Sequence, residues 1–246
     1  GYDSIPIGRC TALGIPVTVV GTANTVSVAE HTMYLMLAAA RAGIELDATV
    51  RRGDFAARTR LAGVELRRRT LLIVGHGRIG TAVAVRAGAF GMRVCAFDPF
   101  LDAEPDGGIE VVTDLDEGLR AADVVSLHLP LTAQTLHLIS ARELALLPPG
   151  AILVNTARGG LVDEQALLES IRCGHLRGAG LDTFETEPLP TDSPLLAERR
   201  IVLSPHAAAL TEEALVAMGL ATVANALAGI DGTLDPELVV NPQALA

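Results

Sequence analysis

Three polar residues of the sequence could together transfer a proton beside a bound carboxylate. Arg158, Glu187 and His206 each follow a short apolar run of the kind that forms a buried strand. A histidine titrates near neutral pH and can give or take the proton of an alcohol, while a neighbouring carboxylate orients it. A guanidinium binds adjacent carboxylate and carbonyl oxygens through its planar fork. These residue types suit the interconversion of a hydroxyl and a carbonyl group next to a carboxylate.

Each of these residues also has a plain structural interpretation. Arg158 could pair with a surface acid, and Glu185 competes with Glu187 for the place beside the histidine. A single histidine is more often structural than catalytic, but His206 is set apart by its place after a predicted strand and by its small neighbours. Because parallel strands present their carboxyl ends at one edge, we expect the three residues to converge there.

A glycine-rich turn predicts a dinucleotide site at the same edge. The apolar run 70–74 leads into Gly75, Gly77 and Gly80 and then into a helical pattern. The first glycine permits the tight turn, the second lets the backbone approach a pyrophosphate, and the third lets the helix pack closely. Asp98 ends the next predicted strand, where an acid accepts ribose hydroxyls and repels a 2′-phosphate. The pattern predicts NAD rather than NADP, against the alternative of a glycine turn with a capping aspartate.

The elements that must position these residues form a repeating strand and helix pattern. The runs of Val, Ile and Leu are continuous rather than alternating, which indicates strands buried on both faces. Helical patterns lie between them, and glycines follow some of these patterns. The sequence therefore predicts an α/β fold with a doubly wound parallel sheet of the Rossmann type. The predicted strands are residues 17–20, 71–74, 94–97, 124–129, 152–154, 179–181 and 201–203.

Two boundaries divide the chain into three expected parts. Residues 21–210 are predicted to form the nucleotide-binding domain. Residues 1–20 and the helix and tail of 211–246 are predicted to belong to a second domain, which is incomplete here. The stretch DAEPDGG at 102–108 is expected to be a surface loop.

Composition disfavours several classes of function. The 246 residues include 19 Arg and no Lys, which excludes P-loop and Schiff-base chemistry that needs a lysine amine. A formal net charge of −10 disfavours nucleic acid and anionic membranes as partners. The three cysteines lack metal-ligand spacing, and no uninterrupted apolar run reaches about 18 residues. We therefore expect no metal, no membrane span and a cytoplasmic location.

The order of the motifs resembles the D-isomer-specific 2-hydroxyacid dehydrogenase family, and in particular its phosphoglycerate dehydrogenase and C-terminal-binding-protein-like branches. The resemblance implies an NAD-dependent oxidoreductase that interconverts a D-2-hydroxyacid and its 2-oxoacid. A non-enzymatic, NAD(H)-sensing interaction protein of the same fold, similar to a corepressor, is the alternative. The motifs cover nearly the whole chain and are NTVSVAEHTMYLML, VGHGRIG, DPF, SLHLPLT, ILVNTARGGLVDE, GAGLDTFETEP and LSPH.

The resemblance implies roles for individual residues. Arg158 binds the substrate, His206 is the acid/base, and Glu187, directly before Pro188, is the partner of His206. Further substrate contacts are expected from Asn24 and from Gly1, which would end a loop that holds the substrate carboxylate. The expected cofactor residues are Gly75, Gly77, Arg78, Ile79, Gly80, Asp98, Pro130, Thr156, Ala157, Asp182 and Val28.

The resemblance also implies a homodimer and a flavodoxin-like second domain formed by both ends of the chain. The helical pattern at 26–41 is apolar on more than one face and, with the arm around 51–55, is similar to the family's dimer contact. Family members carry a segment ahead of the equivalent of Gly1, so we expect this chain to lack part of the second domain. Alanines at 207–209 replace the usual glycine pair after His206, as in the C-terminal-binding-protein branch.

Overall fold

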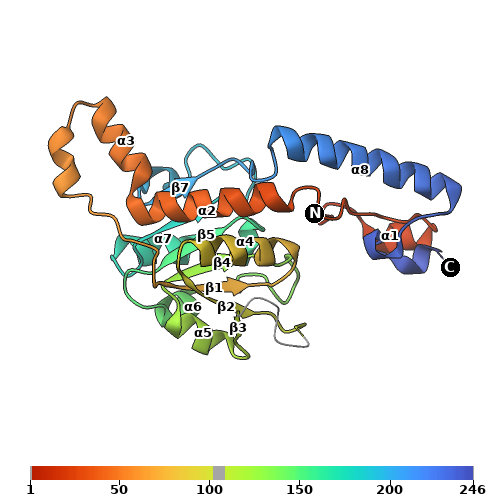
Figure 1. The fold of residues 1–246 in the computed structure, drawn as a ribbon, viewed down its shortest axis with the longest axis horizontal. Coiled ribbons are helices and arrows are strands. Elements are labelled where there is room, and N and C mark those ends of the chain that lie inside the picture. Colours follow the sequence, from red (N-terminus) through yellow and green to blue (C-terminus); the bar gives the residue numbers. More distant parts are fainter. Residues whose placement is uncertain (1, 102–108, 246) are drawn as a thin grey trace. The chain divides into compact units, whose positions relative to one another are not determined.

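A seven-stranded parallel sheet forms the centre of the fold (Figure 1). The computed structural model describes residues 2–101 and 109–245, so Gly1 and the predicted loop at 102–108 lie outside the described residues. The sheet order is β3-β2-β1-β4-β5-β6-β7, which means that the chain winds outward from β1 in both directions, as predicted. The strands are β1 (Thr70–Val74), β2 (Arg93–Phe97), β3 (Glu110–Val111), β4 (Val124–Leu127), β5 (Ile152–Asn155), β6 (Gly178–Leu181) and β7 (Ile201–Leu203).

The sheet is buried on both faces, as its continuous apolar strands require. Leu71 and Ile73 of β1 pack into one hydrophobic cluster, while Leu72 and Val74 pack into the other. The first cluster lies under α2 (Thr25–Arg41) and α4 (Arg78–Ala89). The second lies under α5 (Leu115–Ala121), α6 (Ala141–Leu146) and α7 (Glu164–Arg172), on the opposite face in Figure 1.

Helix α2 packs closely on β6, next to the β7 edge of the sheet, because β6 carries a glycine beneath it. A Cβ atom added to Gly180 would lie 2.7 Å from the Cβ of Leu35. Most of the apolar residues of α2, including Met33 and Met36, are buried within the same chain. The prediction that this helix is too apolar for one domain surface to cover is therefore wrong for these residues. The large apolar side chains of α2 that remain exposed are Val26 and Tyr34.

A short arm follows α2. It consists of α3 (Gly43–Arg51) and the 3-10 helix η1 (Phe55–Thr59), and both Val50 and Phe55 are exposed on it. The side chain of Asp54 caps η1 by accepting a hydrogen bond from the N–H of Ala57 at 3.1 Å. Two further 3-10 helices, η2 (Gly159–Leu161) and η3 (Pro194–Ala197), lie in the loops after β5 and β6.

The chain divides into two compact units, which we describe separately. Unit 2 is Val28–Ala208 and contains the sheet, whereas unit 1 combines the residues up to Ser27 with those from Ala209 onward. The boundaries expected from the sequence were 20/21 and 210/211. The run predicted as a strand at 17–20 does not join the sheet, because Thr18 instead forms an isolated antiparallel bridge with Val239 in unit 1.

Unit 1 joins the two ends of the chain. The N–H of Val19 donates to the carbonyl of Leu238 at 2.9 Å, and the N–H of Val240 donates to the carbonyl of Val17 at 2.8 Å. The amide of Asn241 closes the same region by donating to the carbonyl of Ile15 at 3.0 Å. The helices of this unit are α1 (Ile7–Ala12), α8 (Glu212–Asp231), η4 (Pro236–Leu238) and η5 (Pro242–Leu245).

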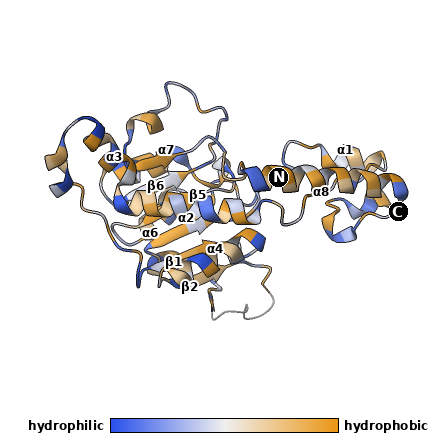
Figure 2. Ribbon diagram, turned by 45° about the horizontal axis from the view of Figure 1, so that its top comes forward, coloured by the Kyte–Doolittle hydropathy of each residue, from blue (hydrophilic) through white to orange (hydrophobic). Residues whose placement is uncertain are grey.

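Helix α8 has a mostly exposed apolar surface. Leu220, Val223 and Ile230 are all more than half exposed, and Figure 2 shows hydrophobic bands along this helix. Within the described residues it is the single helix whose length and composition would allow it to cross a membrane. The sequence of α8 contains no uninterrupted apolar run of this length, because acidic and polar residues lie among its apolar ones. Length and composition alone do not assign α8 to a membrane.

Close packing of α2 on β6 predicts a difference between two glycine substitutions. Gly180→Ala should reduce the free energy of unfolding by about 1–3 kcal/mol, because the new methyl group overlaps Leu35. Gly88→Ala in α4 is the matched control, since a Cβ there meets nothing within 4 Å and alanine favours the helix by about 0.5–1 kcal/mol. Urea unfolding of the three proteins measures both effects, and equal stabilities would contradict the packing described.

Candidate active site

His206 and Glu187 form a direct contact at the carboxyl-terminal edge of the sheet. The Nδ1 atom of His206 lies 2.8 Å from Oε2 of Glu187. The other oxygen of Glu187 accepts a hydrogen bond from the N–H of Phe184 at 3.0 Å, which fixes the carboxylate in its loop. The imidazole is about half exposed, and its Nε2 has no protein partner within the described part of the chain. The ring is thus oriented on one side and open to a ligand on the other.

Glu185, the competing candidate, faces away from His206. Its side chain lies 3.1 Å from Nε2 of His137 and accepts a hydrogen bond from the N–H of Glu164, also at 3.1 Å. In return, the N–H of Glu185 donates to the carboxylate of Glu164 at 2.7 Å. Burial raises the pKa of Glu164, and the negative charges of Glu185 and Glu187 add to this effect. Glu185 therefore joins the loop to the start of α7, and Glu187 is the acid that contacts the histidine.

Arg158 lies in the loop after β5, which a buried asparagine shapes. The side chain of Asn155 donates to the carbonyl of Arg158 at 2.8 Å and accepts from the N–H of Ala157 at 3.0 Å. The next residue, Gly159, lies against the backbone of the following loop, since a Cβ there would be 1.8 Å from the carbonyl carbon of Phe184. The loops that carry Arg158 and Glu187 therefore pack backbone against backbone, which holds both residues at the same edge.

Asp182 holds the backbone around His206. Its carboxylate accepts hydrogen bonds from the N–H groups of Ala207 and Ala208, both at 2.9 Å, and its carbonyl accepts from the N–H of His206 at 2.7 Å. The Oγ of Ser204 donates to the same carboxylate at 2.5 Å. Burial opposes ionisation, but these bonds and one from His31 outweigh it, so the pKa of Asp182 lies below its ordinary value. The sequence placed Asp182 in the cofactor site, and its role in holding this turn was not foreseen.

Two neighbouring residues of α2 reach the loops of the site. His31 lies 2.7 Å from the Oγ of Ser204, and Thr32 lies 2.9 Å from the Oγ1 of Thr156. The sequence analysis singled out neither His31 nor Ser204. No local signal could have found these pairs, because each joins residues that are more than 120 positions apart.

The glycine turn has the shape that a dinucleotide needs. Gly75 has a φ of +93°, and a Cβ on Gly80 would lie 2.3 Å from the carbonyl oxygen of Gly75, so both positions require glycine. A Cβ on Gly77 would meet nothing within 4 Å, which leaves space in front of the first turn of α4. The Nε2 of His76 in the same turn is buried and has no partner within the described chain. The residues present therefore fit a bound pyrophosphate at the helix N-terminus.

Asp98 is oriented towards the same turn. One carboxylate oxygen accepts from the N–H of His76 at 2.9 Å, and the other accepts from the N–H of Phe100 at 3.0 Å. Each carboxylate oxygen has a further lone pair, so both can still accept a ribose hydroxyl. Among the described residues, no group of three or more His, Cys, Asp or Glu is placed to hold a metal ion.

The remaining predicted cofactor residues follow the strand ends or lie on the neighbouring helices. Arg78 and Ile79 form the first turn of α4, and Val28 is buried in α2. Pro130 follows β4, while Thr156 and Ala157 follow β5. Of the predicted substrate contacts besides Arg158, Asn24 lies in the turn before α2 in unit 1, and Gly1 lies outside the described residues. Their roles stay predictions.

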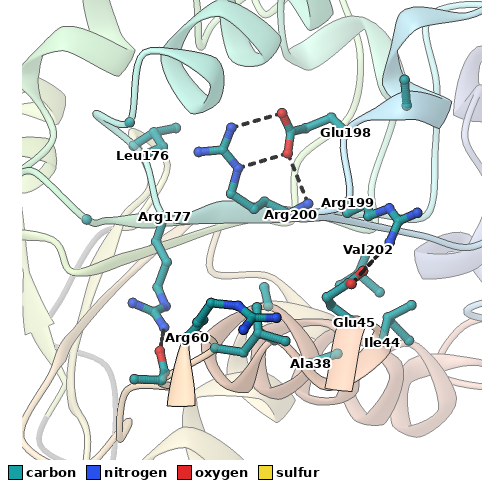
Figure 3. Close-up of a pocket in the computed structure, with 17 residues that line it drawn as sticks. Ala38, Ile44, Glu45, Arg60, Leu176, Arg177, Glu198, Arg199, Arg200 and Val202 are labelled. Carbon is teal, nitrogen blue, oxygen red and sulfur yellow. Dashed lines mark hydrogen bonds and ion pairs between the residues drawn. The ribbon is translucent and has the colours of Figure 1, made fainter. Parts of the chain in front are cut away.

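A cavity of about 740 Å³ lies at the opposite, amino-terminal edge of the sheet (Figure 3). Its arginines are engaged by protein groups: Arg199 with both carboxylate oxygens of Glu45 at 3.1 Å, and Arg200 with Glu198 at 2.8 Å. Arg177 donates to the carbonyl of Ala62 in the segment that follows η1. These contacts hold the arm against the residues that precede β6 and β7. We assign the cavity no part in substrate binding or proton transfer.

Comparison with known proteins identifies a family. Residues 33–208 match the family described as D-isomer specific 2-hydroxyacid dehydrogenase, NAD binding domain. The chain is 45% identical over 221 residues to a D-3-phosphoglycerate dehydrogenase of Methanocaldococcus jannaschii, covering 89% of this chain and 42% of that protein. It is 42% identical to a glyoxylate reductase of Korarchaeum cryptofilum, covering 97% of this chain and 73% of that protein. The chain thus spans less than half the length of the phosphoglycerate dehydrogenases that it matches.

Solved structures agree with the fold. A D-lactate dehydrogenase of Aquifex aeolicus complexed with NAD and lactic acid superposes with a TM-score of 0.88 at 34% identity, over 98% of this chain and 76% of that one. A glyoxylate reductase of Paecilomyes thermophila superposes with a TM-score of 0.91 at 35% identity, over 99% of this chain and 73% of that one. The doubly wound sheet predicted from the sequence is therefore confirmed.

The position of Asp98 predicts a preference between two dinucleotides. Asp98→Ala should weaken NADH binding by about 1–3 kcal/mol, because the substituted protein loses an acceptor for the ribose hydroxyls. The same change should bring NADPH closer to NADH in affinity, since the charge that repels a 2′-phosphate is gone. Calorimetry measures both, with Asp47→Ala in α3 as a control for the loss of one negative charge. Tighter binding of NADPH than of NADH by the unmodified protein would refute the prediction.

Proposed function

Because the chain belongs to the D-isomer specific 2-hydroxyacid dehydrogenase family, we propose that the protein is an NAD-dependent oxidoreductase. It would interconvert a D-2-hydroxyacid and its 2-oxoacid. The observation that carries this proposal is the 2.8 Å contact between His206 and Glu187 at the edge that also holds the glycine turn. A proton donor oriented beside a dinucleotide site is the requirement of this chemistry.

The residues of the site have two kinds of role, which are substrate binding and proton transfer. When bound, NAD(H) supplies or accepts the hydride. In the direction of reduction, His206 would donate a proton from Nε2 to the oxygen of the substrate carbonyl. Glu187 would hold the opposite nitrogen and balance the positive ring, since its carboxylate already contacts Nδ1. Arg158 would bind the substrate carboxylate through its planar fork.

The alternative is a protein that binds NAD(H) and changes partners without turnover. Such a sensor needs the glycine turn and Asp98 to bind NAD(H). It does not need a histidine whose Nδ1 is oriented by a carboxylate and whose Nε2 is accessible to a substrate. The ordered contact between His206 and Glu187 therefore favours the enzyme. We place the enzyme in the cytoplasm, a proposal supported by the three cysteines, which are all free.

A screen of 2-oxoacids with NADH tests the function. The complete natural protein should oxidise NADH with at least one small 2-oxoacid, and His206→Ala should lower kcat by roughly 10²–10⁴-fold because the proton donor is lost. NADH binding to this variant should stay close to that of the unmodified protein, since His206 is not part of the glycine turn. Tight NADH binding without turnover of any 2-oxoacid would support the sensor instead.

The two glutamates of the loop after β6 should differ in effect. Glu187→Gln keeps the shape of the side chain but removes the charge that stabilises the positive imidazole. Because reduction needs the protonated ring, the pH above which 2-oxoacid reduction is lost should move to lower values. Glu185→Gln is the matched control and should be nearly silent, because Glu185 contacts His137 and α7 instead. Rate measurements over the pH range of stability compare the two. A larger effect of Glu185→Gln would contradict the assignment.

We also propose that the protein is a homodimer formed through unit 2. An apolar groove of about 720 Å³ runs between α2, the start of α3 and the end of α4, and its lining includes the exposed side chains of Tyr34, Ile44 and Phe90. The arm that carries the exposed side chains of Val50 and Phe55 follows α2 in the chain and adds to the apolar surface available to a second copy. Exposed apolar surface of this kind is typical of an interface.

Sedimentation at micromolar concentration should show a dimer. Tyr34→Glu combined with Ile44→Glu should give a folded monomer, because two charges would be buried in the contact. Leu196→Glu, an equally exposed leucine in η3, is the control and should leave the dimer intact. A monomer in the unmodified protein would refute the dimer.

A further inference from the structure

A chain of hydrogen bonds runs from α2 to the backbone of His206. The Nε2 of His31 lies 2.7 Å from the Oγ of Ser204 and 3.5 Å from Oδ1 of Asp182, and the Oγ of Ser204 donates to the same carboxylate at 2.5 Å. Asp182 in turn accepts from the N–H groups of Ala207 and Ala208, directly after His206. All of these residues belong to unit 2.

The protons of this chain can be assigned from its chemistry. Ser204 has one hydroxyl proton, which it donates to the carboxylate of Asp182. Its oxygen must then accept from His31, so the Nε2 of His31 carries a hydrogen. The ring of His31 is also packed against Tyr34, with centroids 5.5 Å apart, and its side chain is mostly buried. His31 is therefore a fixed donor rather than a mobile surface group.

The hydrogen-bond series ends at a strained backbone turn, which contains His206. His206 has a φ of +53°, in the left-handed region that residues with a Cβ rarely adopt. Such a conformation persists where the surroundings over-determine it. Here the carbonyl of Asp182 accepts the N–H of His206 at 2.7 Å, while its carboxylate accepts the next two N–H groups. The direction in which the imidazole leaves the backbone therefore depends on the orientation of Asp182.

We propose that His31 is a positioning residue, which acts on Asp182 both directly and through Ser204 to set the orientation of the His206 imidazole. It touches neither of the reacting groups of the proposed function, on which the kinetic part of this inference rests. Without the donor on His31, Ser204 loses one of its two partners, and the buried carboxylate is held less firmly. Glu187 orients one ring nitrogen of His206. The hydrogen bonds that begin at His31 orient the backbone to which this ring is attached.

Four substitutions separate this role from simple packing. His31→Leu keeps bulk but removes the donor, whereas His31→Gln places an amide N–H near the position of Nε2. Ser204→Ala removes the hydroxyl that joins His31 to Asp182 and leaves their direct approach of 3.5 Å in place. His175→Leu is the control, because His175 is another histidine of unit 2 whose Nε2 contacts a protein oxygen, the carbonyl of Leu144 at 3.1 Å.

The first measurement does not depend on turnover. In the complete natural protein labelled with ¹⁵N-histidine, the nitrogen spectrum should show His31 as the Nε2–H tautomer. The imidazole signals of His206 should shift in His31→Leu and in Ser204→Ala, return close to the unmodified positions in His31→Gln, and stay unchanged in His175→Leu. Unchanged His206 signals in His31→Leu, or equal shifts in the Leu and Gln variants, would overturn the proposal. If His31→Leu does not fold, Ser204→Ala decides in the same way.

The second measurement is kinetic. With a 2-oxoacid that the protein reduces, His31→Leu should lower kcat by about tenfold or more, as expected when a reacting group is displaced by a fraction of an ångström. The KM for NADH should change by less than about threefold, and His31→Gln should recover most of the loss. A loss confined to KM would overturn the proposal. If no 2-oxoacid is reduced by the unmodified protein, the proposed function fails, while the spectra of His206 still decide the role of His31.

Discussion

A buried negative charge governs the arrangement of this site. The side chain of Asp182 is fully buried, and a carboxylate in such a place is costly unless hydrogen bonds replace the water that it has lost. Donors from His31, Ser204, Ala208 and Ala207 supply this replacement and keep the pKa of Asp182 below its ordinary value in spite of burial. Except for His31, these donors lie in the segment that carries His206. The hydrogen bonds that stabilise the carboxylate of Asp182 therefore also fix the backbone turn around His206.

The sheet register brings these partners together. Leu181 of β6 pairs with Leu203 of β7, so the residues that follow each strand, Asp182 and Ser204, emerge side by side. The N–H of Ser204 continues this register by donating to the carbonyl of Leu181 at 2.9 Å. The loops after β5 and β6 are matched in the same way, with a glycine at 159 allowing their backbones to touch. Parallel pairing of three adjacent strands thus does most of the positioning, and the side chains complete it.

This dependence on the sheet explains what the sequence could and could not predict. Continuous apolar runs and glycine turns are local signals, and they were sufficient for the positions of the main strands along the chain, the doubly wound parallel sheet and the dinucleotide turn. The pair of His31 and Ser204 has no such signal, because it exists only after α2 has packed on β6. Val17 and its neighbours have the composition of a strand but find their partner near Val239 rather than in the sheet. β3, with two residues, is too short for any periodicity to reveal. The apolar surface of α2 was misjudged for the same reason, since burial beneath a helix depends on a distant glycine.

The pairing of the two chain ends in unit 1 makes unit 2 an insertion within it. Val17 and Val240 meet, although more than 200 residues separate them, and such a loop is entropically expensive for a flexible chain to close. The folded sheet reduces that expense, because the contact of His31 with Ser204 brings together the two points at which the chain leaves unit 2. The halves of unit 1 are then tethered near each other at high effective concentration. During synthesis, this architecture imposes an order, because the residues of unit 2 emerge before Leu238 and Val240, with which Val17 and Val19 must pair.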